Sequence, residues 1–166
     1  MNRNAFGDNQ SEQEDVISRI LFFVEKHWNE IFRFSRRSEY NMNRWSARFG
    51  FEKTAKEIFD KAKSGSNGRY VAVNLINYHT IEFRLFRGTL KYNTFIATLQ
   101  IVNKICDVAL SMSEREIDSM SWSEFVRSIE EEVKDEHGKK VKGEYKKTAV
   151  FHKATIRPKS MPKTAD

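Results

Sequence analysis

Hydrophobic residues recur at helical spacing through the first part of the chain. Between residue 11 and about residue 35, apolar side chains return every three or four positions, which predicts one helix with a wide buried face. Ser11 and Glu14 have the spacing of a capping box, and Asp15 adds a negative charge suited to a first turn. The pattern therefore predicts a helix that begins near Ser11.

Four further segments have helical patterns. Shorter helices are predicted over about 38–48 and over Lys53–Lys63, and longer ones over about 93–111 and 121–136. The helix over 93–111 is expected to bury an apolar stripe formed by Phe95, Ile96, Leu99, Val102, Ile105, Cys106 and Leu110. Cys106 is the only cysteine, so it cannot form an internal disulfide and is expected to be a small buried hydrophobe.

Two strands are predicted between these helices. Residues 68–75 and 80–89 are joined at Asn77-Tyr78, and the second segment alternates in polarity. One of its faces is expected to carry Ile81, Phe83 and Leu85, and the other Glu82, Arg84 and Phe86. Glu82 and Arg84 would lie roughly 7 Å apart on one side of the sheet. That pair suits either the floor of a phosphate or metal site, or a solvated face with an ion pair.

A two-stranded hairpin alone is marginally stable, and its open edges expose backbone donors and acceptors. Residues Glu144–His152 are one candidate for a third strand that covers an edge within the chain, and we favour this arrangement slightly. Pairing with a second copy would instead give a homodimer through the open edge, and a partner protein adding a strand would meet the same need.

These patterns predict an α+β fold, with a small antiparallel sheet packed against several helices. The chain of 166 residues suits one domain over 1–137, followed by a basic tail over 138–166. The tail holds nine basic and two acidic residues, and the rest of the chain is close to neutral. Both prolines lie in the last nine residues, so we expect a flexible end after the possible edge strand.

Five arginines lie within sixteen residues and alternate with aromatic residues. They are Arg33, Arg36, Arg37, Arg44 and Arg48, interleaved with Phe32, Phe34, Tyr40, Trp45 and Phe49. Arginines beside aromatic rings suit contacts with a nucleic-acid backbone and with stacked bases, and they also suit the phosphates of ATP. The alternative is a solvated helix face whose Trp and Phe side chains turn to the core.

The run Thr80–Thr89 resembles the motif that closes the domain of the amidoligase family, Thr-(Ile/Val)-Glu-Phe-Arg-x-Phe-x-Gly-Thr. Further blocks that resemble family positions are Asn4–Gly7, Glu25–Trp28, Phe34–Arg37 and Leu90–Thr94. The resemblance covers about residues 2–110. It implies a glutamine-synthetase/ATP-grasp-like carboxylate–amine ligase fold that uses ATP and Mg²⁺, encoded in phages and other mobile elements. It also implies that Arg36 and Arg37 contact ATP phosphates and that Glu82, Arg84 and Arg87 lie in the cleft.

The chain departs from the family in what precedes these blocks. Family members carry an earlier half with a Glu-x-Glu strand for metal and a His-x-His-Val strand, and this chain opens at Met1 where that histidine strand would end. Activation of a carboxylate through an acyl phosphate needs ATP, metal and both reactants held together. We therefore expect the second half of an amidoligase-like domain, without its catalysis.

The favoured hypothesis is a non-catalytic binding protein of phage or mobile-element origin. It would inhibit host defence machinery in the manner of an anti-CRISPR protein, by binding a nucleic-acid-guided nuclease, and it would need no cofactor. The partner would be a host protein or nucleoprotein, with direct contact to nucleic acid left open. The residues expected to bind are Arg33, Arg36, Arg37, Arg44, Arg48, Glu82, Arg84, Arg87, Lys139, Lys140 and Lys142.

The alternative hypothesis is an ATP- and Mg²⁺-dependent carboxylate–amine ligase completed by a second chain. In that case Glu82 would be a metal ligand, and Arg36, Arg84 and Arg87 would contact phosphates. The four histidines have no metal-ligand spacing to one another or to Cys106, so no metal site is expected from them. No apolar run approaches the roughly 18 residues that span a bilayer. The single cysteine and the polar N-terminus predict a cytoplasmic protein without membrane contact.

Overall fold

The computed structural model describes residues 1–65 and 68–131. It confirms the α+β class, because helices dominate the described part and one short antiparallel hairpin packs against them. The proposed domain end at residue 137, the basic tail and the candidate strand Glu144–His152 lie outside the described residues. The elements in chain order are η1 (Arg3–Phe6), α1 (Gln10–Lys26), α2 (Trp28–Ser35), α3 (Glu39–Trp45), α4 (Ala55–Lys63), β1 (Val73–Asn74), β2 (Glu82–Phe83), α5 (Tyr92–Ser111), α6 (Glu114–Ser119) and α7 (Trp122–Glu131).

The helix predicted over 11–35 is two helices that meet at His27. Hydrogen bonding continues on both sides of this residue, since the His27 amide donates to Phe23 O and the Ile31 amide donates to His27 O. Helix α1 begins at Gln10, one residue before the predicted start, but its N-cap is not Ser11. Asn9 is the N-cap of α1, and its side chain accepts from the Glu12 amide while Glu12 accepts from the Asp8 amide. Glu12 reaches the amide of Asp8, the residue before the N-cap, and not the N-cap amide itself, so the start of α1 lacks the capping box that was expected at Ser11.

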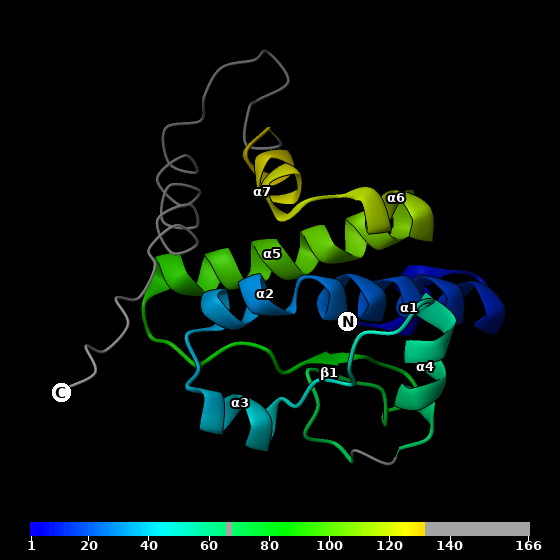
Figure 1. Cartoon of the computed structure of the whole chain (residues 1–166), viewed down its shortest axis with the longest axis horizontal. Coiled ribbons are helices and arrows are strands. Elements are labelled where there is room, and N and C mark those ends of the chain that lie inside the picture. The colour runs from blue at the N-terminus through cyan, green and yellow to red at the C-terminus, as the bar shows by residue number, and fades with distance from the viewer. Residues whose placement is uncertain (66–67, 132–166) are drawn as a thin grey trace, which may run out of the picture.

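Helix α1 lies at the centre of the fold, with the hairpin, α3 and α4 on one side and α5, α6 and α7 on the other (Figure 1). Its buried side chains form a wide face that includes Ile17, Ile20 and Phe23, each with no exposed surface. Helices α4 and α5 pack on different sides of α1. Helix α6 contacts the C-terminal half of α1, and α7 packs on α5. The wide apolar face predicted for the first helix is thus buried from several directions.

The hairpin is shorter than predicted but has the expected face pattern. Val73 pairs with Phe83 and Asn74 with Glu82 in antiparallel register. In and beside β2, two of the three residues predicted for the core face, Ile81 and Leu85, are buried and Phe83 is half-buried. On the other face Glu82 is exposed and Arg84 is half-buried. The alternation read from the sequence therefore places the two apolar residues in the core.

Segments from elsewhere in the chain bridge both edges of the hairpin. Along β2, Met1 and Ile81 exchange two backbone hydrogen bonds of 2.9 Å each, beside a bridge between Asn2 and Thr80. Along β1, the Ala47 amide donates to Tyr70 O and Ala47 O accepts from the Ala72 amide, also at 2.9 Å. These bridges satisfy part of the edge hydrogen bonding within the chain, through segments that the sequence analysis did not assign to the sheet.

The apolar stripe predicted for α5 is only partly correct. Ile105 and Cys106 are buried as expected, but about half of the Phe95, Leu99 and Leu110 surfaces remains exposed. The buried face instead contains Ala97, Ile101, Ile105, Cys106, Val108 and Ala109. The spacing of apolar residues on α5 fits two adjacent stripes, the predicted one and the one observed. Because α5 packs against both α1 and α7, the observed stripe is the one that faces these helices.

Helix α5 is also long and apolar enough to cross a membrane by length and composition alone. The sequence analysis did not identify it as such. A third of its most apolar window is buried inside the fold, and core helices of soluble proteins pass the same test. An absence of membrane contact therefore stays a prediction.

Candidate anion-binding pocket

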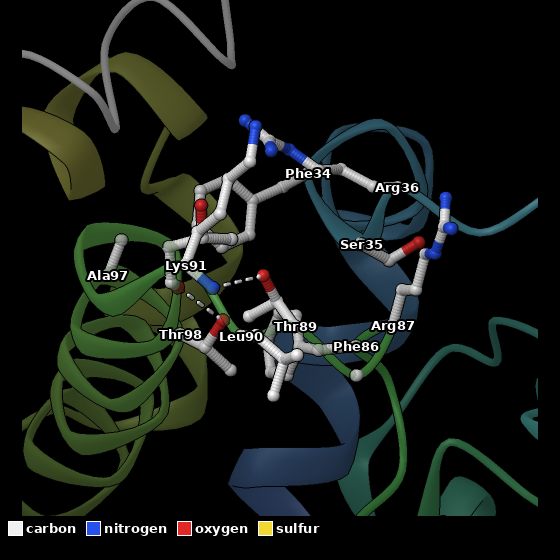
Figure 2. Close-up of a pocket in the computed structure, with 12 residues that line it drawn as sticks. Phe34, Ser35, Arg36, Phe86, Arg87, Thr89, Leu90, Lys91, Ala97 and Thr98 are labelled. Carbon is white, nitrogen blue, oxygen red and sulfur yellow. Dashed lines mark hydrogen bonds between the residues drawn. The ribbon is translucent and has the colours of Figure 1, made fainter.

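A pocket of about 450 Å³ opens between the end of α2, the segment 86–91 and the first turns of α5 (Figure 2). This volume falls within the range of small-molecule sites. Phe34, Phe86 and Ala97 provide apolar walls, and a hydroxyl group comes from each of Ser35, Thr89, Thr94 and Thr98. Three cationic side chains complete the lining: Arg36, Arg87 and Lys91.

Backbone contacts hold Arg36 and Arg87 next to each other. Arg36 ends α2 in the left-handed conformation, with φ of 58°. Just before it, the Ser35 carbonyl accepts a hydrogen bond from the Arg87 amide at 3.0 Å, while Ser35 Oγ donates to Phe32 O. The chain after β2 is therefore attached to the end of α2, and one arginine from each segment reaches the pocket.

Lys91 brings the start of α5 to the same pocket. It is the N-cap of this 20-residue helix, and neither a side-chain cap nor an acidic residue occupies the first turn. The amide of Lys91 itself donates to Thr89 Oγ1 at 3.1 Å. Because the N-terminus of a helix carries partial positive charge, its position next to the pocket adds to the field of the three side chains.

The pocket lining has a single sign of charge. No acidic residue lines it, and within the described part of the chain no ion pair engages Arg36, Arg87 or Lys91. Guanidinium groups and hydroxyls are preferred donors to phosphate and carboxylate oxygens. This arrangement can therefore hold an anionic group without first breaking an internal salt bridge.

Arg37, which follows Arg36, has a different position. Its guanidinium donates to the carbonyl oxygens of Arg84, Leu85 and Phe86 at 3.0–3.2 Å, so it fixes the strand that leads to Arg87. Burial, with a contribution from the positive charge of Arg84, lowers the pKa of Arg37. Arg37 thus supports the pocket from behind and is not part of its lining.

Glu82 and Arg84 form the ion pair that the strand spacing allowed. Arg84 donates to Glu82 Oε1 at 2.8 Å, and Asn74 on β1 donates to Glu82 Oε2 at 3.0 Å. Arg84 also donates to the Trp45 carbonyl. None of these three polar side chains lines the pocket, so the structure separates Glu82 and Arg84 from Arg36 and Arg87.

The remaining arginines of the 33–48 cluster diverge. Arg48 pairs with buried Glu25 and lies over the Trp28 ring, whereas Arg44 lies over Trp45. Arg33 is exposed on α2. Lys139, Lys140 and Lys142 lie outside the described residues. Of the residues expected to bind, Arg36 and Arg87 are the ones that the structure brings together in the pocket.

Sequence reasoning did not assign a site role to Lys91 or to the hydroxyl residues around it. Lys91 lies in the block Leu90–Thr94, which was noted only for its resemblance to a family. The available signal was a lysine directly before a long apolar helix without an acidic first turn, which marks a positive helix start. Among the described residues, no group of three or more His, Cys, Asp or Glu side chains is placed to hold a metal ion.

Comparison of the chain with protein-family models, with curated proteins and with solved structures found no match. The resemblance to the amidoligase family therefore stays a prediction.

Proposed function

We propose that this protein is a binding protein whose pocket, formed by Arg36, Arg87 and Lys91, receives a phosphate group of its partner. The partner that we favour is a nucleoprotein of host defence, such as a nucleic-acid-guided nuclease, and binding would inhibit it without a cofactor. A phage or mobile-element origin fits that activity. The choice of target rests on the sequence hypothesis, and the choice of recognised group rests on the pocket.

The observation that carries the proposal is the unbalanced positive charge around a preformed cavity. Three cationic residues and four hydroxyl residues line this space, and no acidic residue is among them. Two of the hydroxyls, those of Ser35 and Thr98, already donate to backbone carbonyls, so the cations carry the attraction for an anion. Contacts of this kind with a phosphate typically contribute about 1.5–3 kcal/mol each. A phosphate on a polymer would also bring neighbouring charges toward exposed cations, so binding should weaken as salt rises.

The test compares matched neutral variants. Arg36→Gln combined with Arg87→Gln removes two pocket cations, and Lys56→Gln combined with Arg115→Gln removes two exposed cations on α4 and α6. Affinity for a guide-RNA-loaded nuclease is measured by surface plasmon resonance. We expect the pocket variant to lose at least about ten-fold in affinity, while the control variant stays within about three-fold of wild type.

Two outcomes would contradict the proposal. One is equal loss in the pocket and control variants, which would indicate nonspecific attraction by net charge. The other is recovery of no macromolecular partner when the wild-type chain is purified from its host. Inhibition of target cleavage by wild type, lost in the pocket variant, would support both the site and the inhibitory role.

A second candidate is the ATP- and Mg²⁺-dependent carboxylate–amine ligase, completed by a second chain. The observation in its favour is that the pocket has the volume and the cations for a nucleotide. In the structure, however, Glu82 lies outside the pocket, and its carboxylate accepts hydrogen bonds from Asn74 and Arg84. An ATP- and Mg²⁺-dependent rise in Tm that is lost in Glu82→Gln would favour the ligase over the binding protein.

A further inference from the structure

A second cationic surface lies around Trp45 and Tyr70. The two rings meet edge to face, with centroids 5.0 Å apart. The Arg44 guanidinium lies 4.9 Å from the centroid of the Trp45 ring, and Arg84 lies 5.3 Å from that of Tyr70. Residues from α3, from the segment before β1 and from the segment after β2 therefore form one alternating array of rings and guanidinium groups.

The array continues at both ends. At the α3 end, Arg44 donates to Tyr40 Oη at 2.6 Å and lies 5.9 Å from its ring centroid. At the other end, Arg69 lies 5.7 Å from the centroid of Tyr70. We call this set, formed by Tyr40, Arg44, Trp45, Arg69, Tyr70 and Arg84, the ring–arginine surface.

Much of the ring–arginine surface faces solvent. Tyr40 is 66% exposed and Tyr70 is 43% exposed, although large aromatic side chains are among those that proteins preferentially bury. Arg44 and Arg69 are exposed as well, and neither forms an ion pair with any described residue. Arg84 is paired with Glu82, but the Arg44 and Arg69 guanidinium groups beside the exposed rings are not neutralised, which favours an anionic ligand with flat rings.

We propose that the ring–arginine surface stacks the unpaired bases of a single-stranded nucleic acid. Every base has a flat face that stacks on aromatic side chains and on guanidinium planes, so this recognition tolerates different sequences. Arg44 and Arg69 then contact the phosphates that flank the stacked bases. In a duplex the bases are already stacked on one another, so the surface discriminates in favour of single strands.

The ring–arginine surface and the pocket are close along the chain. Arg84 of the surface and Arg87 of the pocket are three residues apart, so their Cα atoms cannot be more than about 11 Å apart. Arg36 of the pocket precedes Tyr40 of the surface by four residues. A strand stacked on the surface therefore has a phosphate-binding pocket nearby. This inference goes beyond the proposed function, because it assigns direct contact with the nucleic acid rather than with the protein part of a nucleoprotein.

The test measures the binding of a fluorescein-labelled 15-nucleotide oligothymidine by fluorescence anisotropy, with a 15-base-pair duplex as the competing structure. Tyr70→Ala removes one ring and Tyr70→Phe keeps it. Tyr78→Ala is the matched control, because Tyr78 is 77% exposed and lies outside the surface. We expect Tyr70→Ala to weaken binding by roughly five- to one-hundred-fold, from the usual contribution of one stacked base. Tyr70→Phe and Tyr78→Ala should bind within about two-fold of wild type.

Tyr40→Ala is a second variant that does not disturb the sheet, because Tyr40 is an exposed residue of α3. It should weaken binding in the same direction, and thermal unfolding of each variant shows that the fold persists. The proposal is overturned if wild type binds the duplex as tightly as the single strand, if it binds neither, or if Tyr70→Ala and Tyr78→Ala behave alike.

The pocket variants keep the two proposals separable. Arg36→Gln with Arg87→Gln tests the pocket, and Tyr70→Ala tests the surface. If Tyr70→Ala reduces capture of the nuclease but leaves oligothymidine affinity unchanged, the ring–arginine surface contacts protein and the stacking proposal fails, while the pocket proposal stands. If instead the pocket variant binds the nuclease with wild-type affinity and Tyr70→Ala does not, the proposed function fails and the stacking proposal stands.

Discussion

The carboxylate of Glu25 on α1 accepts a hydrogen bond of 3.0 Å from Arg48 Nε, and it is almost wholly buried. Its two oxygens also accept from the backbone amides of Phe49 and Gly50, at 2.7 and 3.1 Å. One side chain therefore satisfies three donors of the segment after α3. That segment also carries the bridge from Ala47 to the hairpin edge, so Glu25 attaches the edge of the sheet to the central helix.

The Glu25 contacts predict unequal costs for the two partners. Glu25→Ala leaves two backbone amides and a guanidinium without their acceptor, and it should lower the free energy of unfolding by about 2–4 kcal/mol. Arg48→Ala should cost less, about 1–3 kcal/mol, because the Arg48 side chain is 41% exposed and two amides still bind the buried carboxylate. Urea denaturation measures both, and a larger loss in Arg48→Ala would contradict this account.

The contacts of Arg37 lead us to expect that one substitution will change both the stability of the fold and the geometry of the pocket. Its planar guanidinium reaches three successive carbonyl groups, which the single ammonium of lysine cannot do. Arg37→Lys should therefore lower the free energy of unfolding by about 1–2 kcal/mol. It should also weaken phosphate-dependent binding, because Arg87 follows the carbonyls that Arg37 holds. Arg33→Lys, at an exposed position of α2, is the control and should change stability by less than about 0.5 kcal/mol.

His27 predicts a loss of stability in mild acid. It is buried, with the Phe23 ring centroid 4.7 Å away and the Trp122 centroid 5.6 Å away. Burial, helped by the charge of Lys26 and opposed by a hydrogen bond with the Met120 backbone, lowers the pKa of His27 to about 4. Between pH 6.5 and pH 4 the unfolded chain therefore binds a proton that the folded protein does not.

The sign follows from that difference in proton uptake. The contribution of His27 is fully present above about pH 6.5 and is lost as the pH falls toward 4, by about 2–3 kcal/mol at most. His27→Phe keeps a ring in the aromatic site and removes the titration. Chemical denaturation at pH 7.0 and 4.5 should show a smaller drop for His27→Phe than for wild type. Equal drops would indicate that His27 is protonated in the folded protein.

Cys106 predicts an unreactive thiol. The side chain is 2% exposed on α5, and burial, together with the neighbouring charge of Asp107, raises the pKa of the thiol to about 12. Since the thiolate is the reactive form, the native protein should not react with a disulfide reagent at pH 8 over minutes, and it should react completely in guanidinium chloride. Rapid labelling without denaturant would mean that α5 opens locally.

Local sequence signals predicted the helices well where packing was simple. The segment Lys53–Lys63 contains α4, and its start is fixed by a capping box between Thr54 and Glu57 that the structure forms in full. The hairpin faces were predictable because a period of two assigns every other residue to the core, as Ile81 and Leu85 show.

The features that sequence did not reveal depend on neighbours distant in the chain. His27 interrupts a helix without any Gly or Pro, and it does so where Trp122 and Phe125 pack from α7. The pocket combines Arg36 with Arg87, and the hydrogen bond between Ser35 O and the Arg87 amide holds these two residues close together. No local pattern encodes such a meeting, and the same holds for Tyr70 beside Trp45.

The pairing of Met1 with Ile81 also sets a time order for folding. These residues are separated by 80 positions, so the outer row of the sheet closes one of the longest loops in the described chain. A ribosome adding about 5–20 residues per second needs on the order of 4–16 s between the two residues. During that interval the segment around Met1 has no native partner in the sheet, although all of α1 has already been synthesised.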